Sequence, residues 1–405
     1  MNSNSSFRIE QYTSNQYNAL RELFQHAVPQ INPPDYFFHD RGMYEWQYKG
    51  FGHEQSKALL LYEEEQVVGF RGVIPGLYQV PLKDGTYVIE KGSAISGWLS
   101  RDDLPEVKRM GLKLHLEAQE KLPVALACSF GIDLSLPIYK MSKFNLMDGL
   151  RRYVLPLDTS GYKKLIPDEV DDVLISTWSK DVELCLKRIL PLEPVVMSAE
   201  DLEALWKKIS GQTPFFSLHK TREFWRWRYI DCPAYRYLFW GDPDGAGVIV
   251  GRVESIFTRK DNQYDESDYL YGKKVLRLIE ILPANKEVWQ GDSEPSFVQL
   301  AGSVLKWSRE QGCLAADFQC SSARFSNALS TIGFKEQDVN YQPPLCGLAG
   351  LFQPLRFKPD PINAAWRVKL KDYPGLSFDA NDTYFVKSDA AADHPKFWPL
   401  PKGFR

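Results

Sequence analysis

One stretch of the chain recurs later in degraded form. Residues 128–145 read CSFGIDLSLPIYKMSKFN, and residues 317–336 read DFQCSSARFSNALSTIGFKE. Both place an apolar run before a turn and a short helix, and both end near a phenylalanine, Phe144 or Phe334. Similar matches surround Trp46 and Trp227, which are 181 residues apart. Recurrence of the same element order predicts two structural repeats in tandem.

The chain of 405 residues is too long for one ordinary hydrophobic core. We therefore expect a first domain over residues 1–150, a connecting segment over 151–195 and a second domain over 196–340. The remaining residues, 341–405, are rich in proline and aromatic side chains and are expected to wrap the domains as a tail.

Hydrophobic periodicity gives the expected elements. In the first half we expect helices over 14–27, around 43–48 and after Pro105, and strands over 58–62, 67–78, 88–99 and 124–128. The connecting segment is expected to hold a strand at 173–176 and a helical patch at 182–190. In the second half we expect helices over 198–209 and 296–311 and strands over 237–240, 247–253, 275–282 and 315–320.

Charge and cysteine usage exclude several function classes. The formal net charge of -3 gives no general attraction to nucleic acid, although a local cationic pocket for one phosphorylated ligand stays open. The 6 cysteines lack metal-ligand spacing, so we expect reduced, structural thiols and no metal. The N-terminus does not resemble a signal peptide and no apolar run reaches membrane length, so a soluble, cytoplasmic protein without membrane insertion is expected.

The region from Leu99 to Leu112 has the features of a phosphate site. A strand there runs into a loop and a helix start, where unpaired backbone N–H groups attract anions. Lys108, Arg109 and Lys113 add positive charge, and Gly111 permits close approach of the backbone. An ordinary solvated helix face explains the same residues.

Tyr139 is the candidate proton donor. A helix tyrosine whose hydroxyl faces a cleft can protonate a thiolate leaving group. Packing in the core is the alternative for a tyrosine flanked by Ile138 and Met141.

The pattern SxxIYxxxKF from Ser135 to Phe144, with the element order, resembles the GNAT superfamily of acyl-CoA-dependent N-acyltransferases. Members of that superfamily carry AxxLYxxxGF, with the tyrosine as general acid toward the coenzyme A thiolate, and a Q/RxxGxG/A loop that holds the pyrophosphate. Tyr139 and Phe144 match, Lys143 replaces the usual glycine, and only Gly111 fits the loop. Leu329 stands at the tyrosine position of the second repeat.

The resemblance implies an α/β (α+β) fold of two tandem GNAT-like domains, each a mixed, mainly antiparallel sheet flanked by helices. It implies acyl-CoA as co-substrate and catalysis in the first half, because only that half keeps the tyrosine. The residues implied for acyl-CoA binding lie around the third core strand and the helices that follow it: Gly97, Trp98, Leu99, Ser100, Lys108, Arg109, Met110, Gly111, Leu112, Lys113, Ser129 and Leu136.

Transfer to an amine also requires a base and a polarised carbonyl. Glu90, His53 and Asp133 are base candidates in the first half, and Glu280 or His219 are candidates if the second half reaches across. Backbone N–H groups near Gly97, Trp98 and Leu99 are expected to polarise the thioester carbonyl. For each of these candidate bases, a purely structural role is the alternative explanation.

The second half is expected to serve the acceptor. Its segment from Trp225 to Tyr229, with the aromatic tail, resembles the dTDP-amino-sugar N-acyltransferases of bacterial surface polysaccharide biosynthesis. Arg226, Arg228 and Tyr229 would then hold a nucleotide diphosphate and its base, with His219 and Glu280 nearby. Core packing is the alternative for these residues.

Two rival functions stay open from the sequence. One is a non-catalytic metabolite sensor or scaffold built on degenerate repeats, and the other is N-acylation of a small amine or a peptide. The acyl chain, the sugar and the oligomeric state are not determined by the sequence.

Overall fold

The computed structural model describes residues 7–27, 39–50, 56–101, 104–120, 122–129, 136–147, 150–158, 160–161, 172–256, 259–260, 263–336, 363–373, 375–379, 381–389 and 393. Within these ranges, no helix is both long and apolar enough to cross a membrane. In the same ranges, no group of three or more His, Cys, Asp and Glu side chains could hold a metal ion.

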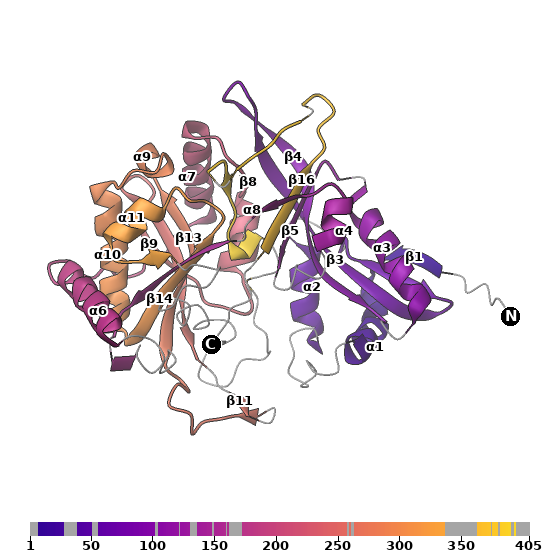
Figure 1. The fold of residues 1–405 in the computed structure, drawn as a ribbon, viewed down its shortest axis with the longest axis horizontal. Coiled ribbons are helices and arrows are strands. Elements are labelled where there is room, and N and C mark those ends of the chain that lie inside the picture. Colours follow the sequence, from indigo (N-terminus) through magenta and orange to yellow (C-terminus); the bar gives the residue numbers. More distant parts are fainter. Residues whose placement is uncertain are drawn as a thin grey trace.

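The first sheet is built mainly from the N-terminal half of the chain (Figure 1). Its main ladder has the spatial order β1-β2-β3-β4-β5-β16-β6, and β8 joins at β3 and carries β17. The bounds are β1 Phe7–Gln11, β2 Leu59–Glu63, β3 Gln66–Pro81, β4 Tyr87–Ser100, β5 Val124–Ser129, β6 Asn145–Met147, β8 Phe216–Leu218, β16 Asn363–Val368 and β17 Thr383–Tyr384.

Helices cover both faces of this sheet. On one face, Phe70 of β3 packs with side chains of α1 and α2, and on the other, Leu61 of β2 packs with Val107 and Leu114 of α3. The short helix α4 follows β5. The bounds are η1 Ser14–Gln16, α1 Tyr17–Ala27, α2 Arg41–Lys49, α3 Pro105–Glu120 and α4 Leu136–Met141.

The second sheet has the order β15-β7-β14-β13-β10-β9. Its strands are β7 Arg151–Pro156, β9 Leu238–Asp242, β10 Gly247–Ser255, β13 Lys274–Pro283, β14 Cys313–Cys320 and β15 Lys335–Glu336, and β11 Arg259–Lys260 pairs separately with β12 Gln263–Tyr264. The helices of this half are α6 Asp172–Leu186, α7 Ala199–Gln212, α8 Arg222–Trp225, the π-helical turn η5 Arg226–Ile230, α9 Lys286–Trp289, α10 Pro295–Glu310 and α11 Ser326–Thr331, followed in the tail by η7 Lys387–Asp389.

Each main ladder contains one parallel pair, β4 with β5 and β13 with β14, among antiparallel neighbours. The predicted fold class, two mixed and mainly antiparallel sheets flanked by helices, is therefore confirmed. The run β5–α4–β6 and the run β14–α11–β15 are the two copies of the repeated stretch.

The two sheets exchange strands. Strand β7 follows β6 in sequence but pairs antiparallel with β14 and β15 of the second sheet. Strand β16 follows β15 across a long interval but lies between β5 and β6 of the first sheet, where its yellow ribbon crosses into the purple half (Figure 1). Each sheet therefore has an interior strand supplied from beyond its own repeat.

The halves also meet through equivalent residues. The indole Nε1 of Trp46 donates to the carbonyl oxygen of Trp227 at 3.3 Å, and Nε1 of Trp227 donates to the carbonyl oxygen of Trp46 at 3.1 Å. The rings lie 5.4 Å apart, and Arg228 donates to Oε1 of Gln47 at 3.2 Å. Both pairs are 181 residues apart, the offset found in the sequence. Such reciprocal contacts are typical of a two-fold relation between like surfaces.

One expected element is wrong. Residues 173–176, expected as a strand, belong to the helix α6. The three consecutive apolar residues Val173, Leu174 and Ile175 fit either state, and only the longer helical context decides between them. The domain boundaries at 150, 195 and 340 stay a prediction. The strand pairings show that residues 151–156 belong to the second sheet and residues 363–368 to the first sheet.

Strand exchange predicts that neither half is stable alone. A fragment of residues 1–195 lacks β16, and a fragment of 196–405 lacks β7, so each would expose two interior strand edges. We expect each fragment to be insoluble alone and the two to elute as one 1:1 complex from size-exclusion chromatography after co-expression. A soluble, cooperatively unfolding single fragment would contradict the exchange.

Candidate functional site

The first sheet opens between its parallel strands β4 and β5. The ladder joins Gly92 to Val124, Ser93 to Ala125 and Ala94 to Leu126, and it has no further pair. Beyond Ala94, β4 continues to Ser100 with β3 as its partner. Two strands that separate in this way leave backbone polar groups along the opening.

A bulge in β4 lies beside this opening. Trp98 pairs with Arg71 and Ser96 pairs with Gly72, so Gly97 is the extra residue, with φ at +61°. A side chain at Gly97 would lie 2.8 Å from the hydroxyl oxygen of Tyr48, and one at Gly72 would collide with the carbonyl of Ser96. Glycine is required at both positions by this close packing. Gly97, predicted to help polarise a carbonyl, thus lies where β4 leaves regular pairing.

Tyr139 of α4 reaches the same opening. Its ring is 3% exposed and packs with Ile95, Ala125 and Ala127 of the separating strands. Its hydroxyl oxygen accepts a hydrogen bond of 2.8 Å from Nη2 of Arg71. A phenol in this position has one lone pair engaged by a cation and a proton left to donate.

Arg71, His115 and Tyr139 are buried and form a cluster with the half-buried Trp98. The guanidinium of Arg71 lies 5.2 Å from the ring of Trp98, whose indole stacks on His115 at 5.4 Å. His115 in turn meets the ring of Tyr139 edge-on at 5.2 Å. Nε of Arg71, Nε1 of Trp98 and both ring nitrogens of His115 have no hydrogen-bond partner in the described part of the chain.

His115 is held neutral. Burial lowers the pKa of its imidazole to about 3, and the charges of Arg71 and Arg367 act in the same direction. The fixed positive charge nearest the hydroxyl of Tyr139 therefore comes from Arg71.

The residues expected to hold the pyrophosphate mostly lie inside α3. Arg109, Met110, Gly111, Leu112 and Lys113 are the fifth to ninth residues of that helix, where backbone N–H groups already bond within the helix. Their N–H groups therefore do not support the predicted phosphate contact.

The side chains of this helix have other surroundings. Arg109 and Lys113 are exposed, and Met110 packs against the core cluster of β2 and α3. A Cβ at Gly111 would lie 3.6 Å from the indole of Trp98, an ordinary van der Waals distance, so Gly111 faces that ring without being required to be glycine. The backbone of Lys108 lies in the first turn, and its side chain is outside the described residues.

The other predicted contacts follow the strands. Trp98 is half-buried and belongs to the cluster with Arg71, Leu99 packs on the opposite face, and Ser100 pairs with Gly69 at the end of β4. Ser129 ends β5 and Leu136 begins α4, and the side chains of both are outside the described residues.

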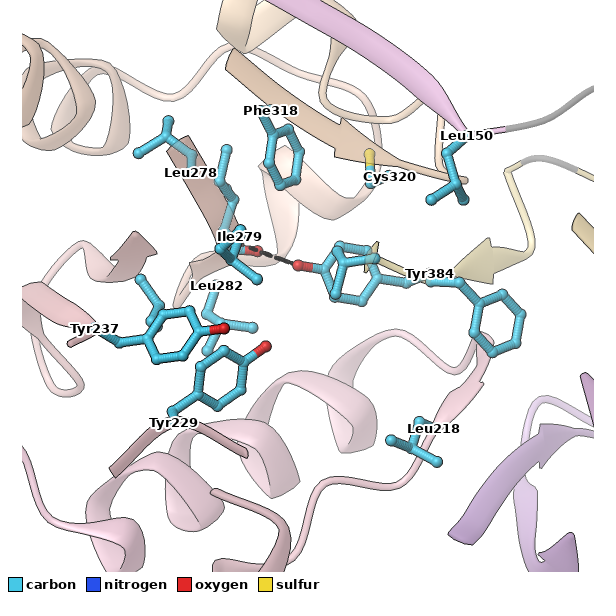
Figure 2. Packing of buried hydrophobic residues seen from close by; sticks show 14 of the residues in the cluster. Leu150, Leu218, Tyr229, Tyr237, Leu278, Ile279, Leu282, Phe318, Cys320 and Tyr384 are labelled. Carbon is cyan, nitrogen blue, oxygen red and sulfur yellow. Dashed lines mark hydrogen bonds between the residues drawn. The ribbon is translucent and has the colours of Figure 1, made fainter. Parts of the chain in front are cut away.

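The second sheet has the corresponding opening, and the tail fills it. The last pair of β13 and β14 is Leu278 with Phe318. Tyr384 inserts there, beside Ile279 and Cys320 (Figure 2). Its hydroxyl oxygen accepts from the amide of Ile281 at 3.2 Å, and its O–H group donates to the carboxylate of Glu280 at 2.9 Å.

The two openings can be compared position by position. Each opening lies beside a β-bulge: Gly97 is the extra residue of β4 opposite Arg71 and Gly72, and Ile279 is the extra residue of β13 opposite Val250 and Gly251. In the second half, the amide of Ile281, two residues beyond this bulge, bonds to Tyr384. In the described part of the first half, no group from outside the sheet bonds to the backbone of Gly97.

Glu280 and Tyr229, predicted on the acceptor side, lie in a closed ionic network. Glu280 contacts Nζ of Lys220 and accepts from the hydroxyl of Tyr229 at 2.6 Å. Lys220 also pairs with Asp389 of the tail at 3.0 Å, and all these side chains are buried. Partners already saturate these groups, so they do not support a role as base or ligand contact in this conformation.

The predicted arginine pair separates into two roles. Arg228 is buried, stacks near Trp46 at 5.3 Å and donates to the carbonyl of Asp393 at 3.1 Å. Arg226 is exposed and pairs with Asp231 at 3.4 Å. His219 is buried, burial lowers its pKa, and its backbone N–H donates to the carbonyl of Leu77 at 2.7 Å. This arrangement does not support nucleotide binding by the segment as a unit.

The base candidates of the first half are not brought to Tyr139 by any described contact. Glu90 pairs with Tyr78 in the β3–β4 hairpin, five residues before Ile95, which is roughly 16 Å along the strand. His53 and Asp133 lie outside the described residues.

Sequence reasoning missed Arg71, His115 and Tyr384. A lone arginine or histidine on an amphipathic element carries no local motif, and the position of Tyr384 in the tail does not indicate its partner.

Stability should depend on pH through His115. In the unfolded chain a histidine has a pKa of about 6.5, so between that value and about 3 the unfolded state binds the proton and the folded state does not. Stability should fall as the pH drops, by about 2 kcal/mol between pH 6.5 and 5. Urea unfolding at pH 7.5 and pH 5 should show the loss in wild type and a smaller loss in H115F. Equal losses would contradict this.

Comparison with solved structures finds relatives in fold. A conserved protein of unknown function from Enterococcus faecalis V583, described as a probable N-acyltransferase, has 8% identity and a TM-score of 0.51, and covers 90% of this chain and 72% of its own. A GCN5-related N-acetyltransferase from Anabaena variabilis ATCC 29413 has 12% identity, a TM-score of 0.49 and coverage of 90% and 73%. The N-myristoyltransferase of Saccharomyces cerevisiae with bound myristoyl-CoA has 13% identity, a TM-score of 0.48 and coverage of 99% and 91%.

No protein-family model and no curated protein matches the sequence. At 8% identity, the likeness to the Enterococcus faecalis protein shows the fold alone. The chain therefore shares the fold of that protein, and its two mixed sheets flanked by helices agree with the predicted fold class.

Proposed function

We propose that the protein is an acyl-CoA-dependent N-acyltransferase whose acyl-CoA site lies in the first half. The observation that carries the proposal is the difference between the two openings. Both openings lie beside a β-bulge, but the opening between β4 and β5 has Tyr139 beside it, whereas the opening between β13 and β14 is filled by Tyr384.

The binding mode follows from the strand edge. Beyond Ala94, β4 has lost its partner on one side, and an extended ligand with amide groups can continue such a ladder. The pantetheine arm of coenzyme A has two amides and an extended form, so we place it along this edge with its thioester near Gly97. Arg109 and Lys113, exposed on α3, supply positive charge toward the phosphates.

The chemistry is a direct transfer. The acceptor amine attacks the thioester carbon, the carbonyl oxygen gains negative charge, and backbone N–H groups around Gly97 stabilise that charge. The C–S bond then breaks with its electron pair on sulfur, and Tyr139 gives its proton to the thiolate. The amine loses its proton to a base that the described residues do not identify.

For the acceptor we keep the amino group of a nucleotide-linked, dTDP-type sugar as the first candidate. Arg228, Tyr229 and Glu280 are buried, so they do not provide the phosphate contacts that a nucleotide-linked sugar would need. This burial favours the alternative acceptors, a small amine or a peptide. A cavity of about 610 Å³ lies beside Val73, Pro75 and Ser93, next to the end of α3. Because Val73 and Arg71 are two residues apart in β3, the cavity and Arg71 lie on the same face of the sheet, the face covered by α3. We propose this cavity as the acceptor site.

The rival is a protein that binds a metabolite without transfer. Its support is the predicted phosphate loop from Lys108 to Gly111, in which only Gly111 fits the superfamily pattern. Release of free thiol separates the two functions, because a sensor binds acyl-CoA without consuming it.

Replacement of Tyr139 by phenylalanine should lower turnover by about 100-fold, the usual contribution of a positioned general acid. Affinity for acyl-CoA should stay within about two-fold, because the ring packing is kept. Thiol release from acetyl-CoA and longer acyl-CoAs should be followed with dTDP- and UDP-amino sugars, simple amines and peptides. Turnover equal to wild type in Y139F would remove Tyr139 as the acid.

Acyl-CoA should bind with a stoichiometry of one per chain. The second opening is occupied by a side chain with three polar contacts to β13, so a ligand there must first displace the tail. Titration calorimetry with a non-reactive acyl-CoA analogue measures this number directly. Two equivalent sites would show that Tyr384 does not close the second half.

A further inference from the structure

We propose that Arg71 is a positioning residue that orients Tyr139 for proton donation. This inference rests on the proposed function and extends it to a residue outside the motif that contains the tyrosine. Its structural basis is the 2.8 Å contact between Nη2 of Arg71 and the hydroxyl oxygen of Tyr139.

Hydrogen-bond chemistry fixes the direction of this contact. A guanidinium has five N–H donors and no acceptor, so the phenol oxygen must accept and its own proton cannot point at Arg71. Within the described residues, the hydroxyl oxygen of Tyr139 has no second hydrogen-bond partner. The proton is therefore kept for a group that enters the opening between β4 and β5.

The surroundings of Arg71 support a dedicated role. Its side chain is 2% exposed, and no carboxylate of the described residues forms an ion pair with it. Buried arginines are ordinarily paired with carboxylates. In the second sheet, Arg252 pairs with Asp393 at 2.9 Å and Arg152 with Asp317 at 3.0 Å. The buried Arg228 and Arg367 donate to carbonyl oxygens instead, whereas Arg71 donates to a phenol.

The register of the strands keeps Arg71 in place. Arg71 pairs across the ladder with Trp98, directly beside the bulge at Gly97, and its guanidinium lies near the Trp98 ring. The indole is held in turn by the stacked ring of His115. The same bulge that exposes the backbone of β4 thus aligns the cation with the tyrosine.

The positive charge also has a chemical effect at the moment of transfer. When Tyr139 gives its proton to the thiolate, the phenol oxygen becomes negative, and a guanidinium that already donates to that oxygen stabilises the charge without reorganisation. His115 is neutral and adds no second cation at this point.

A purely structural role makes a different prediction. Arg71 could serve only to hold Trp98 and His115, and its loss would then affect folding and binding whether or not Tyr139 has a hydroxyl. The two roles are separated by a double-mutant cycle of Arg71 with Tyr139.

The experiment measures kcat, KM for acyl-CoA, analogue affinity and thermal stability for wild type, R71Q, R71K, Y139F and R71Q/Y139F. We expect R71Q to lower kcat by roughly 10- to 100-fold, the span of one lost hydrogen bond to a charged group, with KM changed by less than about three-fold. R71K should recover part of the loss, and R71Q should have no further effect on kcat in the Y139F background.

Arg367 of β16 provides a matched control. It is another buried arginine of the first sheet, and it donates to the carbonyls of Gln119 at 2.6 Å and Ser142 at 3.3 Å instead of to Tyr139. R367Q should lower thermal stability, and any effect it has on kcat should be the same in the Tyr139 and Y139F backgrounds.

The outcomes are distinct. If wild type releases thiol and R71Q lowers kcat equally in both backgrounds, the positioning role is overturned and the proposed function stands. If wild type binds acyl-CoA but releases no thiol with any acceptor, the proposed function and this inference both fail. Loss of the R71Q effect in Y139F, with analogue affinity kept, supports the positioning role.

Discussion

The exchange of β7 and β16 between the two sheets is the constraint on which the rest of the structure depends. Because β16 lies between β5 and β6, the chain must return from the second half before the first sheet is complete. Because β7 lies between β14 and β15, the second sheet needs a strand from the first half. The tail then passes both sheets, which brings Tyr384 to the second opening.

The same topology makes the two halves unequal. Both sheets open after the last pair of their parallel strands, and both openings hold a tyrosine. Tyr139 comes from the helix of its own repeat and faces Arg71, whereas Tyr384 comes from the tail and bonds to the backbone of β13. Leu329 takes the position of Tyr139 in the second repeat and is buried. One opening thus holds a tyrosine hydroxyl beside a cation, and the other is closed by packing and hydrogen bonds.

Much of the fold could be predicted from the sequence. Strands such as β3 and β13 and the helices α3 and α10 have clear periodicity, and the 181-residue offset between Trp46 and Trp227 marked residues that meet across the two halves. Strand exchange could not be predicted, because a strand pattern does not specify its partner.

The site could be predicted only in part. The motif indicated Tyr139, but the partners Arg71 and His115 depend on strand register and helix placement, which single residues do not reveal. The arginines and aromatic residues around Tyr229 were assigned to a ligand by composition, although the structure places Arg228 and Tyr229 in buried contacts. A short segment rich in arginine and tryptophan therefore fits a buried contact as well as a binding surface.

The central claim is that the first half alone is open to acyl-CoA. A crystal structure with a non-hydrolysable acyl-CoA analogue tests it most directly. The account predicts electron density along β4 beyond Ala94, with the thioester mimic near Gly97 and Tyr139, and with Tyr384 unmoved. Density for the analogue between β13 and β14, with Tyr384 displaced, would contradict it.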